Sequence, residues 1–233
     1  MKLLSAAVED YLKTIHELEL EADGDRVGTS ELAQKLGVSN ASVTGMLKKL
    51  AEMEPQLVDY ERYQGVRLTG AGRKIALEVV RHHRLIEAYL IEALGYTWDE
   101  VHDEAEKLEH VISEDLEDRI AAYLGHPTLD PHGDPIPDRE GNMAELEERQ
   151  LTQLEAGERG TITRVSDNPD LLRYLDQLEL ALQAEVEVVK RAPFEGPIHV
   201  RRLEAESVHA LSRKVTDQVF VSPQSTSMEE GTG

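Results

Sequence analysis

The sequence predicts a mainly helical N-terminal part, containing a winged helix-turn-helix, followed by a small β-rich domain. Two observations support this fold class. Up to about residue 124 apolar side chains recur at helical spacing, and only residues 57–68 have the pattern of short strands. Beyond residue 142 the pattern changes to short segments rich in Val, Ile and Thr. A chain of 233 residues is long enough for two small hydrophobic cores.

Glycine, proline and capping residues divide the N-terminal part into helices. Ser39 is the expected N-cap of the third helix, and the segment Thr29–Glu31 offers an N-cap for the second. The two strands expected within residues 57–68 turn near Gln64 and Gly65 and would form the wing. The expected helices are residues 4–21, 31–36, 40–53, 70–94, 98–112 and 113–124.

A proline-rich segment separates the two parts of the chain. Residues 125–142 contain four of the nine prolines and predict a linker or irregular loop at a domain boundary. Beyond it we expect strands at residues 159–166, 184–192 and 197–203, and a helix at about residues 169–180. The expected domains are 1–74 for the winged helix-turn-helix, 75–142 for a helical domain and 143–222 for the β-rich domain, with a flexible tail at 223–233.

The composition limits the class of protein. Hydrophobic residues make up 40% of the chain and aromatic residues 4%, so the cores must consist mainly of aliphatic side chains. There is no run of eighteen apolar residues that would predict a membrane-spanning helix. Glu9 and Asp10 interrupt the N-terminal segment, which argues against a signal peptide, and we expect a cytoplasmic protein. Because the sequence has no cysteine, any metal must be bound by oxygen and imidazole ligands.

The charge of the chain is distributed unevenly. The formal net charge is −21, which by itself argues against binding to nucleic acid. Residues 26–74, however, contain eight Lys and Arg against five Asp and Glu, a net charge of +3 that leaves −24 for the rest. Contact with DNA would then be restricted to one face of the protein. A solvated acidic surface with a neutral patch is the alternative interpretation of the same charges.

The segment TSELAQKLGVSNASVTGMLKKLAEM has the pattern of a helix-turn-helix. Gly37 permits the tight turn, and the inner face of the second helix would consist of Val38, Val43, Leu47 and Leu50. Its outer face carries small polar residues and lysines, which suit base edges and phosphates in the major groove. Together with two wing arginines, the candidate DNA-binding residues are Ser39, Asn40, Ser42, Thr44, Lys48, Lys49, Arg62 and Arg67. An ordinary helical hairpin is the alternative.

Candidate metal ligands lie between residues 83 and 110. His83 and Glu87 are four positions apart and share one helix face. One side of the next helix would carry His102, Glu106, Glu109 and His110. Two helices would thus bring imidazoles and carboxylates to a common seam, and such ligands suit Mn²⁺, Fe²⁺, Zn²⁺ or Co²⁺. A surface or core histidine is the alternative for each single residue.

Several motifs resemble the diphtheria toxin repressor family, which includes the manganese transport regulators. These motifs are VEDYLKTIHELE, SNASVTGMLKKL, RLTGAGRKIA, HHRLIEAYL, VHDEAEKLEHVISEDLEDRI and GDPIP. The likeness is close over residues 5–142 and looser over residues 151–222, which resemble the SH3-like domain of the longer family members. It implies that the helical domain binds metal and dimerises, and that the β-rich domain is SH3-like.

The resemblance also implies two metal sites. Matching positions give a primary site of Asp10, Glu106, Glu109 and His110 and an ancillary site of His83, Glu87 and His102, with Asp167 or Asp170 of the SH3-like domain as a further ligand. Carboxylates at positions 10 and 106 are typical of manganese-sensing members. We therefore expect Mn²⁺ first and Fe²⁺ next, with Co²⁺, Zn²⁺ and Cd²⁺ as substitutes. Lys13 stands where small manganese regulators have another carboxylate, so their close binuclear site is not expected here.

The function implied by the resemblance is metal-dependent regulation of transcription, as a repressor of metal-uptake genes and not as an enzyme. A homodimer, joined through apolar helix faces at about residues 85–120, would bind a palindromic DNA operator, without a membrane partner. Three alternatives stay open: a winged-helix regulator with a merely structural metal site, a metal-binding module without DNA partners, and a di-metal hydrolase. The sequence argues against the hydrolase because it shows no nucleophile motif and no phosphate loop.

Overall fold

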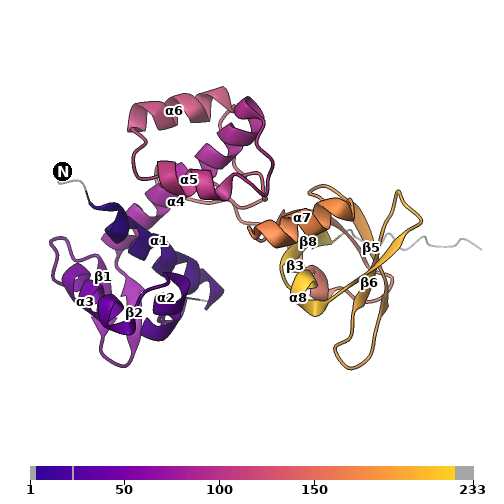
Figure 1. Cartoon of the computed structure of the whole chain (residues 1–233), viewed down its shortest axis with the longest axis horizontal. Coiled ribbons are helices and arrows are strands. Elements are labelled where there is room, and N and C mark those ends of the chain that lie inside the picture. Colours follow the sequence, from indigo (N-terminus) through magenta and orange to yellow (C-terminus); the bar gives the residue numbers. More distant parts are fainter. Residues whose placement is uncertain (1–3, 23, 224–233) are drawn as a thin grey trace, which may run out of the picture. The chain divides into compact units, whose positions relative to one another are not determined.

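A computed structural model describes residues 4–22 and 24–223 (Figure 1). The chain forms two compact units. The first consists of Met1–Ile86, Ala105–Thr128 and Ile136–Met143, and the second of Glu87–Glu104, Leu129–Pro135 and Ala144–Gly233. The tail predicted at residues 223–233 lies outside the described residues from position 224 onward. Among the described residues, no helix combines the length and the hydropathy that crossing a lipid bilayer requires.

The first unit begins with a winged helix-turn-helix (Figure 1). Its helices are α1 (Ala6–Glu21), α2 (Thr29–Lys35) and α3 (Asn40–Ala51), and its wing consists of β1 (Val58–Glu61) and β2 (Gly65–Leu68). Apolar side chains from all of these elements form one buried cluster, in which Leu12, Leu32 and Leu47 are fully enclosed. Burial of one such side chain contributes about 1.5–3 kcal/mol, so the cluster determines how the three helices pack.

The starts of α2 and α3 show one agreement with the prediction and two differences from it. Ser39 caps α3 as expected, because its Oγ accepts a hydrogen bond from the Ser42 amide at 3.2 Å. At α2 the predicted cap is wrong, since the N-cap is Gly28 and Thr29 already belongs to the helix. Val38 was predicted on the inner face of α3, but it precedes the helix and is 40% exposed.

The wing depends on a glycine at the start of β2. β1 and β2 pair antiparallel in a register that sets Glu61 opposite Gly65. Gly65 has φ +97°, and a Cβ at this position would lie 2.4 Å from the carbonyl oxygen of Val27. Val27 comes this close because it exchanges two backbone hydrogen bonds with Val66, at 2.9 and 3.0 Å. Glycine therefore allows the segment before α2 to join the wing.

A buried carboxylate anchors α1 to the wing and to the following helix. Glu19 is 3% exposed, and its two oxygens accept hydrogen bonds from the Leu68 amide at 2.8 Å and from the Arg73 guanidinium at 2.7 Å. Arg73 lies near the start of α4 (Gly70–Leu94). A buried carboxylate is costly unless it is paired. The Glu19 contacts therefore link α1 to β2 and to the start of α4, and we expect these elements to move together.

The chain continues with α5 (His102–Leu108) and α6 (Glu114–Tyr123). The predicted helix over residues 98–112 is wrong at both ends, since α5 has only seven residues. The carbonyl of Trp98 accepts a hydrogen bond from His132 Nε2 at 2.7 Å, and the carbonyl of Glu109 lies 3.1 Å from His82 Nδ1. These two carbonyl groups are paired with imidazoles and not with the amides of a longer helix. Helix α5 spans residues that lie between these two carbonyl groups.

The second unit is built on an antiparallel six-stranded sheet with the order β3-β8-β4-β5-β6-β7. Its strands are β3 (Arg149–Gln150), β4 (Arg159–Val165), β5 (Glu185–Arg191), β6 (Ile198–Arg202), β7 (Val208–Leu211) and β8 (Val219–Pro223). Irregularities of register in β4, between Ile162 and Arg164, and in β5, between Val188 and Lys190, bend the sheet. The sheet encloses a core of aliphatic side chains, as the composition requires.

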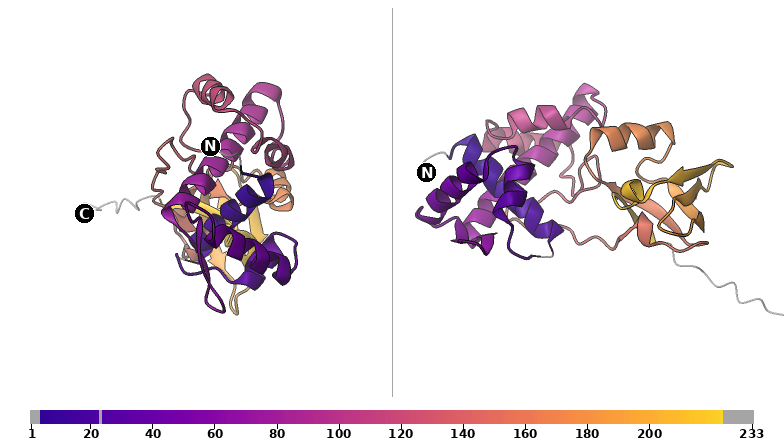
Figure 2. Two further views of the ribbon diagram at one scale, coloured as in Figure 1. Left: turned by 90° about the vertical axis from the view of Figure 1, so that its left-hand side faces the viewer. Right: turned by 60° about the horizontal axis from the view of Figure 1, so that its bottom comes forward.

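Helix α7 (Pro169–Gln177) lies over one side of the strands (Figures 1 and 2), and the short helices η1 (Leu151–Gln153) and α8 (Arg213–Thr216) complete the unit. The Asn168 side chain caps α7 by accepting from the amides of Asp170 and Leu171, at 3.1 Å each. Its buried face consists of Leu171, Leu172 and Leu175. The predictions of α7, β4, β5 and β6 are confirmed, whereas β3, β7 and β8 were not predicted.

Replacing Gly65 with alanine should destabilise the first unit, because the added Cβ meets the Val27 carbonyl oxygen and the positive φ becomes strained. We expect a loss of about 2 kcal/mol in the free energy of unfolding, measured by urea denaturation followed by circular dichroism. Gly45→Ala in α3 is the matched control, since nothing lies within 4 Å of its Cβ position and alanine is the better helix former. Equal stability of the two variants would contradict this role of Gly65.

Candidate metal centre

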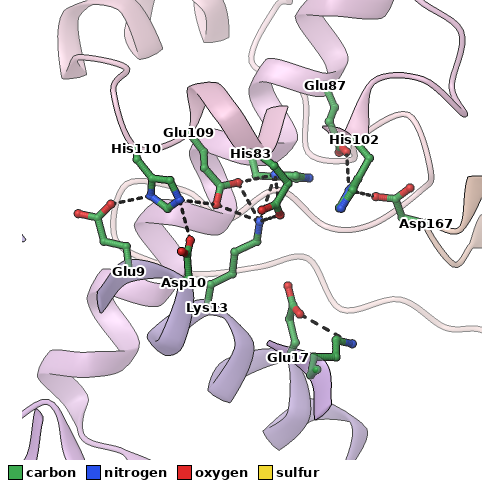
Figure 3. Close-up of polar contacts among 12 residues, drawn as sticks. Glu9, Asp10, Lys13, Glu17, His83, Glu87, His102, Glu109, His110 and Asp167 are labelled. Atoms are coloured by element: carbon green, nitrogen blue, oxygen red, sulfur yellow. Dashed lines mark hydrogen bonds and ion pairs between the residues drawn. The ribbon is translucent and has the colours of Figure 1, made fainter. Parts of the chain in front are cut away.

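Charged side chains of α1 face the end of α5 (Figure 3). Glu9, Asp10 and Lys13 lie on the same side of α1, because positions three or four apart are neighbours on a helix surface. Glu109 and His110 follow directly after α5. The side chains of Glu9 and His110, which are 101 positions apart in the sequence, are in contact. All of these residues belong to the first unit.

His110 is the centre of the first group of ligand-type side chains. Its Nδ1 lies 2.7 Å from Glu9 Oε2, and its Nε2 lies 2.7 Å from Asp10 Oδ1 and 3.3 Å from Glu109 Oε1. Asp10, Glu109 and His110 each offer one ligand atom within 4.8 Å of the other two. Burial raises the pKa of Asp10, and the nearby Glu106 and Glu109 add to this rise while His110 opposes it. A cation at this place would relieve the crowding of negative charge.

Lys13 adds a buried ammonium to the cluster. The residue is 7% exposed, and its Nζ lies 2.7 Å from Glu106 Oε1, 2.8 Å from Glu109 Oε2 and 3.1 Å from His83 Nδ1. Burial opposes the charge of Lys13, but the Glu109 and Glu106 carboxylates outweigh burial and raise its pKa. The ammonium therefore stays protonated and neutralises part of the carboxylate charge.

A second histidine of α4 holds the turn that carries Glu109. His82 Nδ1 lies 3.1 Å from the Glu109 carbonyl oxygen, and His82 Nε2 lies 3.1 Å from Glu117 Oε2. Both partners are acceptors, so both ring nitrogens donate and the ring is an imidazolium. Burial opposes this charge, yet the Glu117 carboxylate raises the pKa of His82. Although burial would raise the pKa of Glu117, His82 and then Arg81 lower it to about 2.

A second group of ligand-type side chains lies in the second unit. It contains Glu87 in α4, His102 at the start of α5 and Asp167 just before α7. His102 Nδ1 contacts Asp167 Oδ2 closely and lies 3.6 Å from Glu87 Oε1. The Asp167 carboxylate, followed by Glu87, raises the pKa of His102 to about 10. These carboxylates therefore create a position that attracts positive charge (Figure 3).

Two further residues of this group lie in the segment that was interpreted as a linker or irregular loop. His132 is 1% exposed, with Nδ1 3.8 Å from Glu87 Oε2 and Nε2 3.9 Å from Asp167 Oδ1. Glu87, Asp130 and His132 each offer one ligand atom within 4.8 Å of the others. Asp130 Oδ1 accepts hydrogen bonds from the amides of His132 and Asp134, at 2.8 Å each, and so fixes the loop.

The donor atoms of both groups fit a divalent cation. In the second group, Asp167 Oδ1 is buried and has no hydrogen-bond partner among the described residues. A buried acceptor in this position would be stabilised by a cation. Carboxylate oxygens and imidazole nitrogens without sulfur suit Mn²⁺, Fe²⁺, Co²⁺ and Zn²⁺. The residues present are therefore compatible with the metal ions that the sequence predicted.

The common seam expected of two helices stays a prediction, and the first unit brings ligand atoms of His83, Glu106 and Glu109 within 4.8 Å of one another. Because α5 ends at Leu108, Glu109 and His110 do not continue the helix face of His102. His83, which the resemblance placed in the ancillary site, contacts Glu109 and Lys13 within the first unit. Glu106 is paired with Lys13 at 2.7 Å.

The two aspartates considered as ligands from the SH3-like domain behave differently. Asp167 joins the second group through its contact with His102. The side chain of Asp170 is 93% exposed and pairs with Arg173 at 2.6 Å, so the structure does not bring it to either group.

Sequence reasoning missed Asp130 and His132 as members of the second group and Glu9 as a neighbour of His110. Helical periodicity does not apply to the proline-rich segment that contains Asp130 and His132. The available signal was a histidine close to two aspartates in LDPHGDP. Glu9 could have been considered because it precedes Asp10 on the same helix.

The candidate DNA-binding side chains lie on α3 and on the wing. The inner face of α3 is buried through Val43, Leu47 and Leu50. Thr44 is half-buried, and its hydroxyl donates to the Asn40 carbonyl at 2.9 Å. The exposed members are Ser39, Asn40, Ser42, Lys48, Lys49, Arg62 and Arg67. The structure therefore leaves most of the set accessible to a partner.

Three family models match successive parts of the chain. The model described as iron dependent repressor, N-terminal DNA binding domain, matches residues 3–66. The model described as iron dependent repressor, metal binding and dimerisation domain, matches residues 69–138. A model of the FeoA domain matches residues 149–223, which include the six-stranded sheet.

Similar proteins match over most of the chain. The iron-dependent repressor IdeR of Mycobacterium tuberculosis is 34% identical over 190 residues, 72% of this chain and 81% of that protein. The diphtheria toxin repressor of Corynebacterium diphtheriae is 37% identical over 138 residues, 59% of each chain. A solved manganese-dependent transcriptional repressor in complex with manganese is 40% identical, with a TM-score of 0.84, and covers 93% of this chain and 100% of that one. The manganese regulator SloR is 32% identical, with a TM-score of 0.76, and covers 93% and 98%.

Replacing Glu117 with glutamine should remove part of the acid sensitivity of the first unit. The pKa of Glu117 falls from 4.5 to about 2 on folding, so its stabilising contribution is present above pH 4.5 and is lost as the pH falls towards 2. We expect the wild-type free energy of unfolding to fall by about 3 kcal/mol more than that of the variant across this interval. Urea denaturation at a series of pH values measures the difference.

Glu114→Gln is the control for this measurement, because Glu114 lies on the same helix with a side chain that is 69% exposed. Its acid sensitivity should match that of the wild type. Parallel pH profiles for wild type and Glu117→Gln would contradict the role assigned to the Glu117 pair.

Proposed function

The chain belongs to the diphtheria toxin repressor family, and on this premise we propose how a bound metal ion controls its binding to DNA. The protein is a metal-responsive DNA-binding transcriptional repressor and not an enzyme. One observation carries the proposal: Asp10 on α1 lies 2.7 Å from His110, which follows α5. A metal ion held by both residues would join α1 to the metal-binding part of the first unit.

The position of α1 matters because α1 supports the DNA-reading elements, α2, α3 and the wing. Glu19 joins α1 to the wing and to α4. Without a cation, the carboxylates of Asp10 and Glu109 beside His110 repel each other. A divalent ion therefore favours the arrangement in which α1 lies against the end of α5. By linkage, it shifts the population of molecules towards the state that binds DNA.

We assign ligands for two metal sites. In the first unit, the site would consist of Asp10, Glu109 and His110, with Glu106 nearby as a further carboxylate. In the second unit, it would consist of Glu87, His102, His132 and Asp167, with Asp130 beside them. The bound ion supplies positive charge and directed coordination, and the protein supplies the positions of the donor atoms.

The chemistry of the donors supports Mn²⁺ as the physiological ion and Fe²⁺ as the next candidate, because both accept carboxylate and imidazole ligands. Similar proteins include a repressor solved with manganese and the iron-dependent repressor IdeR. The related protein ScaR has been solved with Zn²⁺ and with Cd²⁺. We infer that Zn²⁺, Cd²⁺ and Co²⁺ can substitute in this chain.

The DNA complex that we propose places α3 in the major groove and the wing on the phosphate backbone. A homodimer would present two such heads to palindromic half-sites separated by one helical turn, about 34 Å, or a multiple of it. The dimer surface would include exposed apolar side chains of the first unit, namely Leu108, Val111, Leu116 and Tyr123. Base edges and phosphates would be contacted by Ser39, Asn40, Ser42, Thr44, Lys48, Lys49, Arg62 and Arg67.

We further propose that the protein is cytoplasmic and that it represses metal-uptake genes. The matched family domains support a division of roles in which residues 1–74 bind DNA and residues 75–142 bind metal and dimerise. Residues 143–222 would form the SH3-like domain, which contributes Asp167 to the second site.

Replacing Asp10 with asparagine should weaken Mn²⁺ binding at the first site and uncouple metal from DNA. We expect Mn²⁺ affinity to fall roughly 10- to 100-fold, because a charged ligand becomes neutral. The Mn²⁺ concentration needed for operator binding should rise by a similar factor. Calorimetric titration measures the first quantity, and electrophoretic mobility shift with and without Mn²⁺ measures the second.

Asp170→Asn is the control for Asp10, since Asp170 is an exposed aspartate outside both groups. It should bind Mn²⁺ and DNA as the wild type does. Equal affinity of the wild type for DNA before and after chelation of metal would contradict the proposed metal control and would favour a winged-helix regulator with a merely structural metal site.

Replacing His132 with glutamine should remove metal from the second site. Because His132 is 1% exposed among carboxylates, its imidazole is positioned as a ligand and not as a surface group. We expect the variant to bind one Mn²⁺ fewer per chain, as measured by metal analysis after equilibrium dialysis. His126→Gln, at an exposed histidine of the same loop, is the control and should bind as much Mn²⁺ as the wild type. An unchanged metal content in His132→Gln would remove His132 from the site.

A further inference from the structure

The ammonium of Lys13 lies where a cation would be bound by three ligand-type side chains. His83, Glu106 and Glu109 each offer one ligand atom within 4.8 Å of the other two. Lys13 Nζ contacts all three, at 3.1 Å from His83 Nδ1, 2.7 Å from Glu106 Oε1 and 2.8 Å from Glu109 Oε2 (Figure 3). The electrostatic role of a bound ion is thus filled by a side chain of the protein itself.

We propose that Lys13 is a built-in cation that sets the metal sensitivity of the first site, an inference that rests on the proposed function. Glu109 is shared between two neighbours. Its Oε1 lies 3.3 Å from His110 Nε2 and 3.1 Å from Lys13 Nζ. A divalent ion bound by Asp10, His110 and Glu109 therefore competes with Lys13 for one carboxylate. When metal binds, the Lys13 ammonium loses its contact with Glu109 and retains its contact with Glu106.

The surroundings make this competition effective. Glu109 is 1% exposed and Lys13 is 7% exposed, so water screens their interaction little. The side chain of Glu106 is 42% exposed and offers the displaced ammonium a partner at the edge of the cluster. A divalent ion and an ammonium on one carboxylate repel each other. The ammonium therefore lowers the affinity for the ion and raises the metal concentration at which the protein responds.

A purely structural ion pair would give a different result when Lys13 is replaced. If Lys13 only held α1 to the turn after α5, its loss would leave metal binding unchanged or would weaken it by loosening the site. If Lys13 competes with metal, its loss leaves Glu106 and Glu109 without their cation, and they attract a divalent ion more strongly. The sign of the change in affinity therefore distinguishes the two roles.

The test compares the full-length wild type with Lys13→Met, which keeps the aliphatic stem and removes the charge, and with Lys13→Gln, which keeps a polar end. Mn²⁺ is titrated into each protein by calorimetry. Melting temperatures with and without Mn²⁺ are recorded by circular dichroism. We expect the Kd for Mn²⁺ to fall about tenfold in both variants. The rise in melting temperature on adding Mn²⁺ should also be larger than in the wild type.

Lys35→Met is the matched control. Lys35 pairs with Glu21 of α1 at 3.2 Å and with Glu17 at 3.9 Å, and neither is a proposed ligand. The Lys35→Met substitution removes the same charge from the first unit and should leave the Kd for Mn²⁺ unchanged. A Kd that is unchanged or higher in both Lys13 variants would overturn the inference. Absence of Mn²⁺ binding by the wild type would instead overturn the proposed function.

Discussion

The first unit holds several carboxylates so close together that a cation must offset their mutual repulsion. Glu9, Asp10 and Glu109 surround the His110 imidazole, and Glu106 lies beside Lys13. Withdrawing such groups from water costs free energy, and their mutual repulsion adds to that cost. Two cations can offset it: an ammonium that belongs to the chain and a divalent ion that comes from solution. Only the concentration of the divalent ion varies with conditions. The need to offset the carboxylate charge therefore makes the fold responsive to metal supply.

Histidines shape the backbone that carries these carboxylates. His132 and His82 pair with the carbonyls of Trp98 and Glu109, which flank the seven-residue helix α5. A continuous helix over residues 98–112 would have kept Glu109 and His110 on the face of His102, but α5 ends at Leu108. Glu117 holds His82 from α6, the helix that also presents Leu116 and Tyr123 to solvent. The ligand turn is thus connected to the proposed dimer surface through one hydrogen-bonded pair.

The elements that the sequence predicted well are those determined by neighbouring residues. Amphipathic spacing and caps located α1, α3, α4 and α6 because their causes lie within a few positions. The carbonyls that flank α5 contact imidazoles 34 and 27 positions away, and no local pattern contains these contacts. β3 has two residues, so it is too short to show alternation. Spacing alone could not place Asp10 beside His110, and that candidate site came from the family resemblance. Asp130 and His132 escaped notice because a loop has no periodicity.

Both ligand groups consist of oxygen and nitrogen donors, and the sequence contains no cysteine. A thiolate ligand is oxidised by peroxide to sulfenic acid or a disulfide and then releases its ion. Carboxylates and imidazoles do not undergo this chemistry. Occupancy of the two proposed sites would therefore follow the supply of divalent ions and not the thiol redox state of the cell. An oxidant that modifies the ligands of a thiolate-based regulator would therefore leave the donor atoms of this protein unchanged.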